Sequence, residues 1–397
     1  MKRILLTWEL GSGLGHVAPL TAFGQHLSDT LDAEVWYCFQ TLHEQIPFPI
    51  YKRMLQAPPV HSARNPIGRP RTFSDMLHNI GFDNQNGLHG AFSAWRDIFS
   101  LVRPDVLVCE FSPVSLLASR GLPMARVQIG TGWYVPPPGV PVPAYRHLPG
   151  HGIERQRAME SAMLERVNQV LGEFDAPAMQ SLTDFYHQVD LTALSTTPEF
   201  DHFDRVQPPR YLGHAPAHPA NPESLSWPPG DGPRIFAYLK PFRGLTTLLK
   251  QLANGQYRVI IFAAEQAWET GRHFAGSQVK VSPRPVALDS VADANLVISH
   301  AGHGLIHETL ALELPMLLLP LHREQQVNAG NAREAGAALV VDCTGPEPEA
   351  EAFETALDQL LGEPRFRQAA QACGRSHDPA IYPGLTALSG AIRELME

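Results

Sequence analysis

The chain has 397 residues, 44% of them hydrophobic, and its 31 basic and 40 acidic side chains give a formal net charge of −9 at pH 7. This length suits two domains of ordinary size, and the acidic balance argues against a nucleic-acid-binding protein, which usually presents a basic face. No apolar run approaches the roughly 20 residues of a membrane span, and we expect the N-terminus to form a strand rather than a signal peptide. The four cysteines form no CxxC pair and indicate no disulfide framework, which favours a reducing, cytoplasmic location.

Apolar runs alternate with segments of helical composition through the first half of the chain. Such alternation is typical of βαβ units and predicts a parallel sheet covered by helices. The expected strands are residues 3–8, 34–39, 104–109, 124–129 and 189–195, and the expected helices are one that ends near residue 31 and four more at 87–101, 112–120, 154–171 and 178–187. The Pro-rich stretches 48–71 and 133–152 are expected to be irregular.

A glycine-rich turn joins the first expected strand to the first expected helix. It reads GSGLGHVAPL over residues 11–20. Its glycines are spaced GxGxG rather than GxGxxG, and no Lys-Ser or Lys-Thr pair follows them. The turn therefore fits neither the dinucleotide-binding fingerprint nor a phosphate-binding P-loop.

A Pro-, Gly- and Ala-rich stretch, residues 208–233, separates this half from a second α/β series. The expected strands there are residues 235–239, 257–263, 278–281, 296–299, 316–319 and 338–341, and the clearest helices are 323–335, 350–361 and 385–396. We therefore predict two Rossmann-like domains, residues 1–204 and 219–375, joined by a linker at residues 205–218.

The strand-to-helix junction at residues 296–312 is the most informative stretch of the second half. The turn His300-Ala-Gly-His-Gly304 precedes helical sequence, so free backbone N–H groups and the positive end of a helix dipole face any ligand there. Phosphates suit such a place. The next apolar run ends at Pro320 and precedes Glu324-Gln325, and in an open α/β sheet both loops reach one crevice.

The spacings His300-x-Gly302-x5-Glu308 and Pro320-x3-Glu324-Gln325 resemble the sugar-nucleotide signature of GT-B glycosyltransferases. The resemblance is to the UDP-glycosyltransferase and macrolide glycosyltransferase group, with some similarity to MurG-type enzymes. Residues 13–20 are similar to a GxGHxxPL turn of the same family. The resemblance implies two Rossmann-like parallel-sheet domains that face each other across a cleft. It also implies that the C-terminal helix, residues 376–397, packs back on the first domain.

For the second domain, the resemblance implies a site for a nucleoside diphosphate sugar, with a UDP-sugar expected, and no other cofactor. Gly302, Gly304 and Leu305 would offer backbone N–H groups to the diphosphate, and His300 would donate a hydrogen bond to a phosphate oxygen. The other implied donor ligands are Glu308, for the ribose hydroxyls, and the pair Glu324-Gln325, for the sugar hydroxyls.

For the first domain, the resemblance implies an acceptor site next to Gly13, Gly15 and His16. A histidine at a helix N-terminus stays neutral and can accept the proton of an attacking hydroxyl. Glu110 ends a strand of the same half and stands where the family has an acidic partner, which orients the ring. We therefore predict a His16–Glu110 dyad; the alternative is that His16 only caps its helix or lines the cleft. The Pro-rich stretch 133–152 is either a surface crossover or a wall of the acceptor pocket.

Five positions depart from the family pattern. Ala301 replaces a glycine or cysteine, Leu305 a serine or threonine, and Glu324 an aspartate; Glu313 stands where glycine is usual, and Lys240 where a small residue is usual. Lys240 is either an added phosphate contact or a solvated lysine. His300, His303 and His307 do not form a zinc motif such as HExxH, so no metal is expected.

The predicted reaction is transfer of a hexose, with inversion, to a hydroxyl of a small or lipophilic acceptor. Three alternatives remain open. One is a MurG-like transferase that acts on a lipid-linked acceptor, with peripheral membrane contact. The others are a nucleotide-sugar epimerase or hydrolase on the same fold, and a non-catalytic sugar-nucleotide-binding partner of another protein. The protein is expected to be a monomer or a homodimer, with no nucleic-acid partner.

Overall fold

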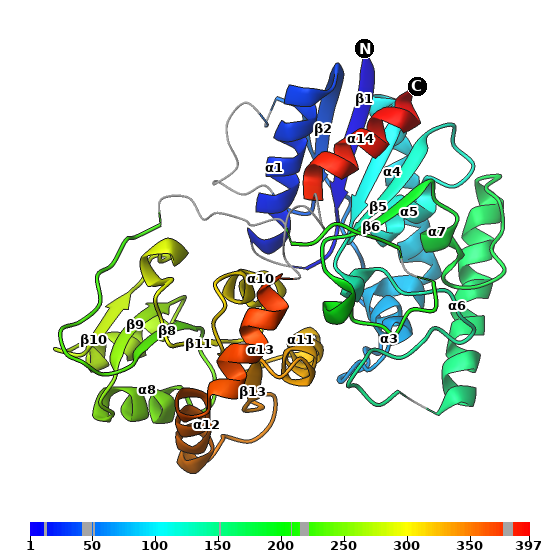
Figure 1. Ribbon diagram of the computed structural model, residues 1–397. Helices are drawn as coiled ribbons and strands as arrows, with labels where there is room; N and C mark the ends of the chain where they lie inside the picture. Colours follow the sequence, from blue (N-terminus) through cyan, green and yellow to red (C-terminus); the bar gives the residue numbers. More distant parts are fainter. Residues whose placement is uncertain are drawn as a thin grey trace. The chain divides into compact units, whose positions relative to one another are not determined.

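The computed structural model describes residues 1–11, 14–41, 50, 52–150, 152–207, 209–214, 222–375 and 384–397. The chain divides into two compact units, each built on one sheet with helices around it (Figure 1). Unit 1 comprises Met1–Ala217 and Tyr382–Glu397, and unit 2 comprises His218–Ile381. The last segment of the chain therefore belongs to the same unit as the first strand.

Unit 1 contains a seven-stranded sheet in the order β3-β2-β1-β4-β5-β6-β7, and every described strand pair in it is parallel. Its strands are β1 (Lys2–Trp8), β2 (Ala33–Phe39), β3 (Met54–Gln56), β4 (Val106–Glu110), β5 (Ala125–Gly130), β6 (Leu191–Leu194) and β7 (Arg210–Tyr211). Its helices are α1 (Leu14–Thr30), α3 (Phe73–Leu77), α4 (Gln85–Val102), α5 (Pro113–Ala118), α6 (Ile153–Glu173), α7 (Asp184–His187) and α14 (Gly384–Met396), with short turns η1 (His78–Phe82), η2 (Gly132–Tyr134) and η3 (Pro198–Phe200).

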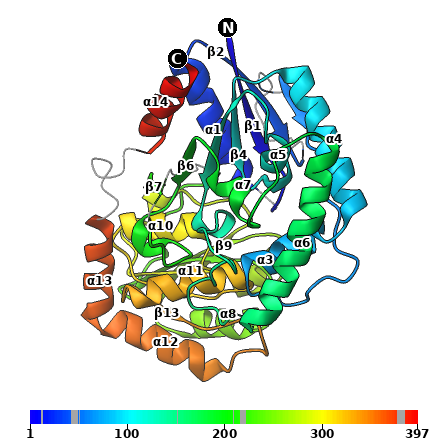
Figure 2. The same cartoon turned by 90° about the vertical axis from the view of Figure 1, so that its right-hand side faces the viewer.

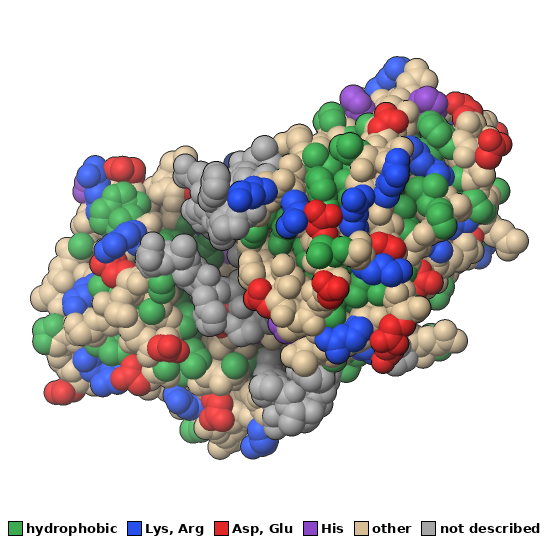
Figure 3. Space-filling model, turned by 90° about the horizontal axis from the view of Figure 1, so that it is seen from above, with side chains coloured by type: hydrophobic (Ala, Val, Ile, Leu, Met, Phe, Trp, Pro, Cys, Tyr) green, Lys and Arg blue, Asp and Glu red, His purple; other side chains and the backbone are tan. Residues whose placement is uncertain are grey.

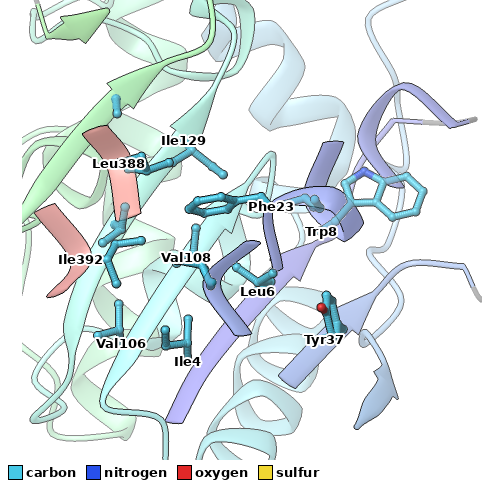
Figure 4. Close-up of a cluster of buried hydrophobic side chains, with 14 of the residues drawn as sticks. Ile4, Leu6, Trp8, Phe23, Tyr37, Val106, Val108, Ile129, Leu388 and Ile392 are labelled. Atoms are coloured by element: carbon cyan, nitrogen blue, oxygen red, sulfur yellow. The ribbon is translucent and has the colours of Figure 1, made fainter. Parts of the chain in front are cut away.

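The core of unit 1 follows from the alternation of side chains along buried strands. Ile4, Leu6 and Trp8 of β1 point to one face, where they pack with Phe23 of α1 and Leu388 of α14 (Figure 4). Burying each such side chain contributes about 1.5–3 kcal/mol relative to leaving it exposed. The apolar contacts thus fix α1 and α14 on the same face of the sheet.

Helix α14 lies beside α1 (Figure 1), and two polar contacts also hold it there. The ring Nε2 of His26 lies 3.1 Å from Ser389 Oγ, and the Arg393 guanidinium donates to the carbonyl of Thr30 at 3.0 Å. The first helix and the last helix of the chain therefore stabilise each other.

Unit 2 contains a six-stranded parallel sheet in the order β10-β9-β8-β11-β12-β13. Helix α12 packs against α8, and α13 packs against α10 (Figure 2). The strands are β8 (Arg234–Leu239), β9 (Arg258–Ala263), β10 (Val279–Ser282), β11 (Leu296–Ser299), β12 (Met316–Leu318) and β13 (Ala338–Val340). The helices are α8 (Leu245–Asn254), α9 (Ala267–Gly271), α10 (His303–Ala311), α11 (Arg323–Glu334), α12 (Ala350–Gly362) and α13 (Pro364–Gly374), with turns η4 (Arg272–Phe274) and η5 (Leu288–Val291).

Both sheets are doubly wound: the first strands are added on one side of the unit's first strand, and the later strands are added on its other side. In unit 1 the reversal falls between β1 and β4, and in unit 2 it falls between β8 and β11. Ligands of open α/β sheets bind in the crevice at such a switch point, outside the carboxyl ends of the strands.

The predicted α/β class with two parallel sheets is confirmed, but three local predictions were wrong. The short strands β3 and β7 lie in stretches expected to be irregular or linker, because strands of two or three residues are defined by pairing rather than by composition. The helix expected at residues 178–187 forms only as α7. The Asp184 carboxylate accepts the N–H groups of Gln180 and Ser181, and this closes a turn in place of the first helical residues.

On the face shown in Figure 3, basic and acidic side chains are interspersed, and the coloured residues form no extended basic area. Within the part of the chain that the structure describes, no helix combines the length and the apolarity needed to cross a bilayer.

Candidate functional site

At the switch point of unit 1, His16 and Glu110 contact each other. Ring Nδ1 of His16 lies 2.9 Å from Oε1 and 3.0 Å from Oε2 of Glu110. Glu110 is the last residue of β4, which pairs with β1, and His16 lies in the first turn of α1 directly after β1. With an ionised Glu110, Nδ1–H donates a hydrogen bond to the carboxylate, and the acceptor lone pair of the neutral ring is then on Nε2.

Aromatic side chains enclose the imidazole of His16. Trp8 stacks on it with ring centroids 5.4 Å apart, Tyr134 tilts toward it at 5.4 Å, and Phe111 lies at 6.1 Å. Both members of the dyad are about nine-tenths buried. The pair therefore sits in an apolar setting, where electrostatic interactions are stronger than in water.

Gly11 approaches the other ring nitrogen of His16. A Cβ added at Gly11 would lie 2.3 Å from His16 Nε2, and the backbone there has φ +93°, a left-handed conformation that favours glycine. Only glycine leaves room beside Nε2. Gly13 lies outside the described residues, and a Cβ at Gly15 would meet nothing within 4 Å.

We expect Gly11→Ala to displace the His16 ring and to strain the turn. The left-handed conformation alone costs a non-glycine residue about 1–2 kcal/mol. Thermal unfolding should show the strain, and the 2.9 Å contact between His16 and Glu110 should lengthen in a structure of the variant. Gly90→Ala, on an open face of α4, is the matched control: it should leave the His16 position unchanged and raise the unfolding midpoint slightly, because alanine is favoured over glycine in a helix interior by about 0.5–1 kcal/mol. An unaltered His16 position in Gly11→Ala would contradict the prediction.

In unit 2, the turn between β11 and α10 lies at the switch point. Gly302 is the N-cap of α10, its backbone is extended, and as a glycine it has no side chain to cap the helix. A Cβ at Gly302 would meet nothing within 4 Å, so there is open space beside this backbone. Asn328 of α11 donates to the carbonyl of Ala301 at 3.0 Å and holds the turn in place. The arrangement presents N–H groups and the helix dipole to an anion.

His300 is not oriented as the resemblance implies. Its Nδ1 donates to the carbonyl of Leu319 at 2.9 Å, and its Nε2 accepts the backbone N–H of Lys240 at 2.8 Å. Burial lowers the pKa of this imidazole to about 4, so the ring is neutral at neutral pH. Because both nitrogens are occupied within the protein, the predicted hydrogen bond from His300 to a phosphate does not fit this arrangement. The ring instead ties the ends of β8, β11 and β12 together.

The remaining predicted donor ligands lie on α10 and α11. Leu305 and Glu308 are half-buried on α10, and Glu324 is half-buried in the first turn of α11. The side-chain oxygen of Gln325 accepts the N–H of Leu321 at 2.8 Å, which closes the loop that precedes α11. Gly304 is the second residue of α10.

The sequence of unit 2 matches a known family. Residues 249–378 match the glycosyltransferase family 28 C-terminal domain. A stretch of 73 residues is 40% identical to UDP-N-acetylglucosamine--N-acetylmuramyl-(pentapeptide) pyrophosphoryl-undecaprenol N-acetylglucosamine transferase of Prochlorococcus marinus (strain MIT 9211). That stretch covers 17% of this chain and about a fifth, 20%, of the length of the relative.

Solved structures align with the whole chain. CalG4, the calicheamicin glycosyltransferase, has a TM-score of 0.71 at 14% identity, over 100% of this chain and 98% of that one. The glycosyltransferase VinC, solved in complex with DTDP, has a TM-score of 0.65 at 17% identity, over 99% of each chain. This chain has the GT-B fold.

Two of the departures from the GT-B glycosyltransferase pattern fall at left-handed backbone positions. Ala301 has φ +57° and Glu313 has φ +59°. Glycine, which is expected at position 313 and is one of the two residues expected at position 301, adopts such angles without steric cost. Ala301 is fully buried, whereas Glu313 is exposed just after the end of α10.

We expect Glu313→Gly to stabilise unit 2. Relief of the left-handed strain, offset by the extra flexibility of glycine in the unfolded chain, leaves a gain of about 0.5–1 kcal/mol. Chemical denaturation measures it as a higher midpoint with an unchanged slope. Glu313→Ala keeps the strain and should leave the midpoint near that of the original protein. An equal rise in both variants would show that loss of the charge, and not the backbone angle, is responsible.

The structure thus brings together His16 and Glu110 in unit 1, and it gathers His300, Gly302 and Asn328 at one sheet edge in unit 2. Sequence reasoning did not identify Gly11 as the residue against Nε2, nor the aromatic rings around His16. The only available signals were a third glycine before the GxGH turn and a tryptophan at the end of β1.

Proposed function

We propose that this GT-B protein is an inverting glycosyltransferase that moves a hexose from a nucleoside diphosphate sugar to a hydroxyl acceptor. The observation that carries the proposal is the contact of His16 Nδ1 with both oxygens of Glu110 at the switch point of unit 1. A neutral imidazole oriented by a carboxylate is a general base, and an attacking hydroxyl needs one.

The donor is assigned to the turn before α10. The N–H groups at this helix start and the open space beside Gly302 suit a diphosphate, whose negative charge grows as the glycosidic bond breaks. The helix terminus supplies the stabilisation, so the proposal requires no metal ion. The short similarity to a transferase named for UDP-N-acetylglucosamine and the DTDP in VinC support a uridine or thymidine diphosphate sugar.

In the proposed reaction the acceptor hydroxyl transfers its proton to Nε2 of His16 as its oxygen attacks the anomeric carbon. The bond from that carbon to the β-phosphate oxygen breaks, and its electron pair leaves with the nucleoside diphosphate. Glu110 stabilises the imidazolium that forms. Attack from the side opposite the leaving group inverts the anomeric centre. The aromatic rings of Trp8, Phe111 and Tyr134 favour an acceptor with an apolar body. All four cysteines are free, which suits a reducing compartment.

A second candidate is transfer to a lipid-linked acceptor at a membrane surface. The 73-residue similarity to the undecaprenol-dependent transferase favours it, but this similarity covers only a short stretch of the chain. Adding vesicles that carry a polyprenyl-linked sugar acceptor distinguishes the two candidates, because only the lipid-linked reaction depends on them.

The ligand class is tested by thermal unfolding with UDP, TDP, their sugars and NAD. A ligand that binds only the folded state stabilises it by mass action, by about 2.7 kcal/mol at 100 times its dissociation constant. We expect a rise with UDP or TDP and none with NAD. A rise with NAD alone, or no rise with any nucleoside diphosphate, would contradict the proposed donor site.

A further inference from the structure

We propose that Lys240 is a ligand of the donor diphosphate and that Glu265 holds its ammonium group when no donor is bound. The inference rests on the proposed function and adds a charged side chain to the backbone site at α10.

The backbone of Lys240 is fixed beside the diphosphate turn. Lys240 directly follows β8, the strand on one side of the switch point, and its N–H donates to His300 Nε2 at 2.8 Å. His300 directly follows β11, on the other side, and is only 2% exposed. Two residues later in the chain, Gly302 is the N-cap of α10. The buried imidazole therefore ties the lysine to the segment that offers N–H groups.

The charge of Lys240 reaches the ends of the neighbouring strands. Burial is the largest cause of the lowered pKa of His300, and desolvation is the largest cause of the lowered pKa of His322, which follows β12. The positive charge of Lys240 lowers both pKa values further. A lowered pKa favours the neutral form of both histidines. The positive charge that an arriving diphosphate meets from these three residues is that of the lysine.

The ammonium group of Lys240 pairs weakly with a carboxylate, and it also hydrogen-bonds the Tyr238 hydroxyl. Nζ of Lys240 lies 3.4 Å from Oε1 of Glu265, and the two side chains are 40% and 56% exposed. An exposed ion pair of this length contributes little to stability. A diphosphate carries more negative charge than one carboxylate and offers several oxygens, so it displaces Glu265 from the lysine.

Substitutions of Lys240 and of Glu265 are expected to change the affinity for diphosphates in opposite directions. Calorimetric titration with UDP, TDP, UMP and TMP measures these affinities. Lys240→Met should weaken binding of the diphosphate by about 10-fold or more, the effect of losing a charge-assisted hydrogen bond. Binding of the monophosphates should change much less. Glu265→Gln should tighten diphosphate binding, because the competing carboxylate is lost. Lys240→Arg should restore part of the affinity.

Lys250, exposed on α8 of the same unit, gives the matched control: Lys250→Met should bind UDP and TDP as the original protein does. Thermal unfolding without ligand establishes that the variants are folded. Unchanged diphosphate affinity in Lys240→Met, or equal losses for monophosphates and diphosphates, would overturn the inference while leaving the donor site intact. If the original protein binds neither UDP nor TDP, the proposed function fails and the inference fails with it.

Discussion

Replacing His16 by alanine is expected to lower the turnover number for sugar transfer by about 10²–10⁴-fold, the usual contribution of a general base. The affinity for the nucleoside diphosphate should stay nearly unchanged, because the proposed donor turn lies in unit 2 and His16 lies in unit 1. Steady-state transfer kinetics together with calorimetric titration of UDP or TDP separate the two effects.

Glu110→Gln is the companion variant. The amide keeps the size of the side chain but can present its NH₂ group to Nδ1, which would favour the tautomer with the proton on Nε2 and so block proton acceptance. We expect a loss of turnover that approaches that of His16→Ala, and a double variant no worse than the single ones, because the two residues act as a unit. Near-full turnover in His16→Ala would refute the dyad.

The second large effect concerns Glu9, a buried carboxyl in the segment that joins β1 to α1. It is 1% exposed and accepts hydrogen bonds from Trp95 Nε1, from the N–H of Val114 at 2.8 Å and from the N–H of Ser115 at 3.0 Å. Val114 and Ser115 lie in the first turn of α5. Glu9 thus joins the end of β1 to the start of a helix that begins 104 residues later.

Glu9→Ala is expected to destabilise unit 1 by about 3 kcal/mol or more, because three buried donors lose their acceptor at about 1–3 kcal/mol each. The midpoint of thermal unfolding should fall by several degrees. Glu165→Ala, an exposed site on α6, is the control and should change stability by no more than about 0.5 kcal/mol. A comparably small change in Glu9→Ala would show that water or other groups replace the carboxyl.

The stability contribution of Glu9 should depend on pH. Burial raises the pKa of this carboxyl from 4.5 to about 8, against the opposing effect of its hydrogen bonds. Between these values the folded state holds a proton that the unfolded chain has released, so stability falls as pH rises from 4.5 toward 8.

Glu9→Gln has no proton to lose, so its destabilisation relative to the original protein should shrink from pH 5 to pH 8. Unfolding by urea at several pH values measures the difference. A constant or growing difference would mean that the three donors keep the folded carboxyl ionised.

The fold was predictable because its signals are local. Each βαβ unit repeats an apolar run, a turn and a helical segment, and the glycines of the two junctions stand next to the histidines that they accompany. Glu110 could be proposed as the partner of His16 because the ends of adjacent parallel strands meet at one edge.

The hydrogen bonds of His300 could not be predicted from the motif because its two partners come from distant parts of the chain. Lys240 precedes it by 60 positions, and Leu319 follows it by 19. The burial of Glu9 likewise depends on Trp95, which lies 86 positions away. Local sequence does not reveal such distant partners. Only the packed structure shows which side chains hold strands together.

The configuration of the product tests the central claim most directly. The purified protein is incubated with an α-linked UDP- or TDP-hexose and a panel of apolar alcohols and phenols, and proton NMR follows the anomeric signal. We expect a β-linked product that forms in step with the release of nucleoside diphosphate and only when an acceptor is present. An α-linked product, or release of free sugar without an acceptor, would contradict the assignment of His16 and Glu110 as the base of an inverting transferase.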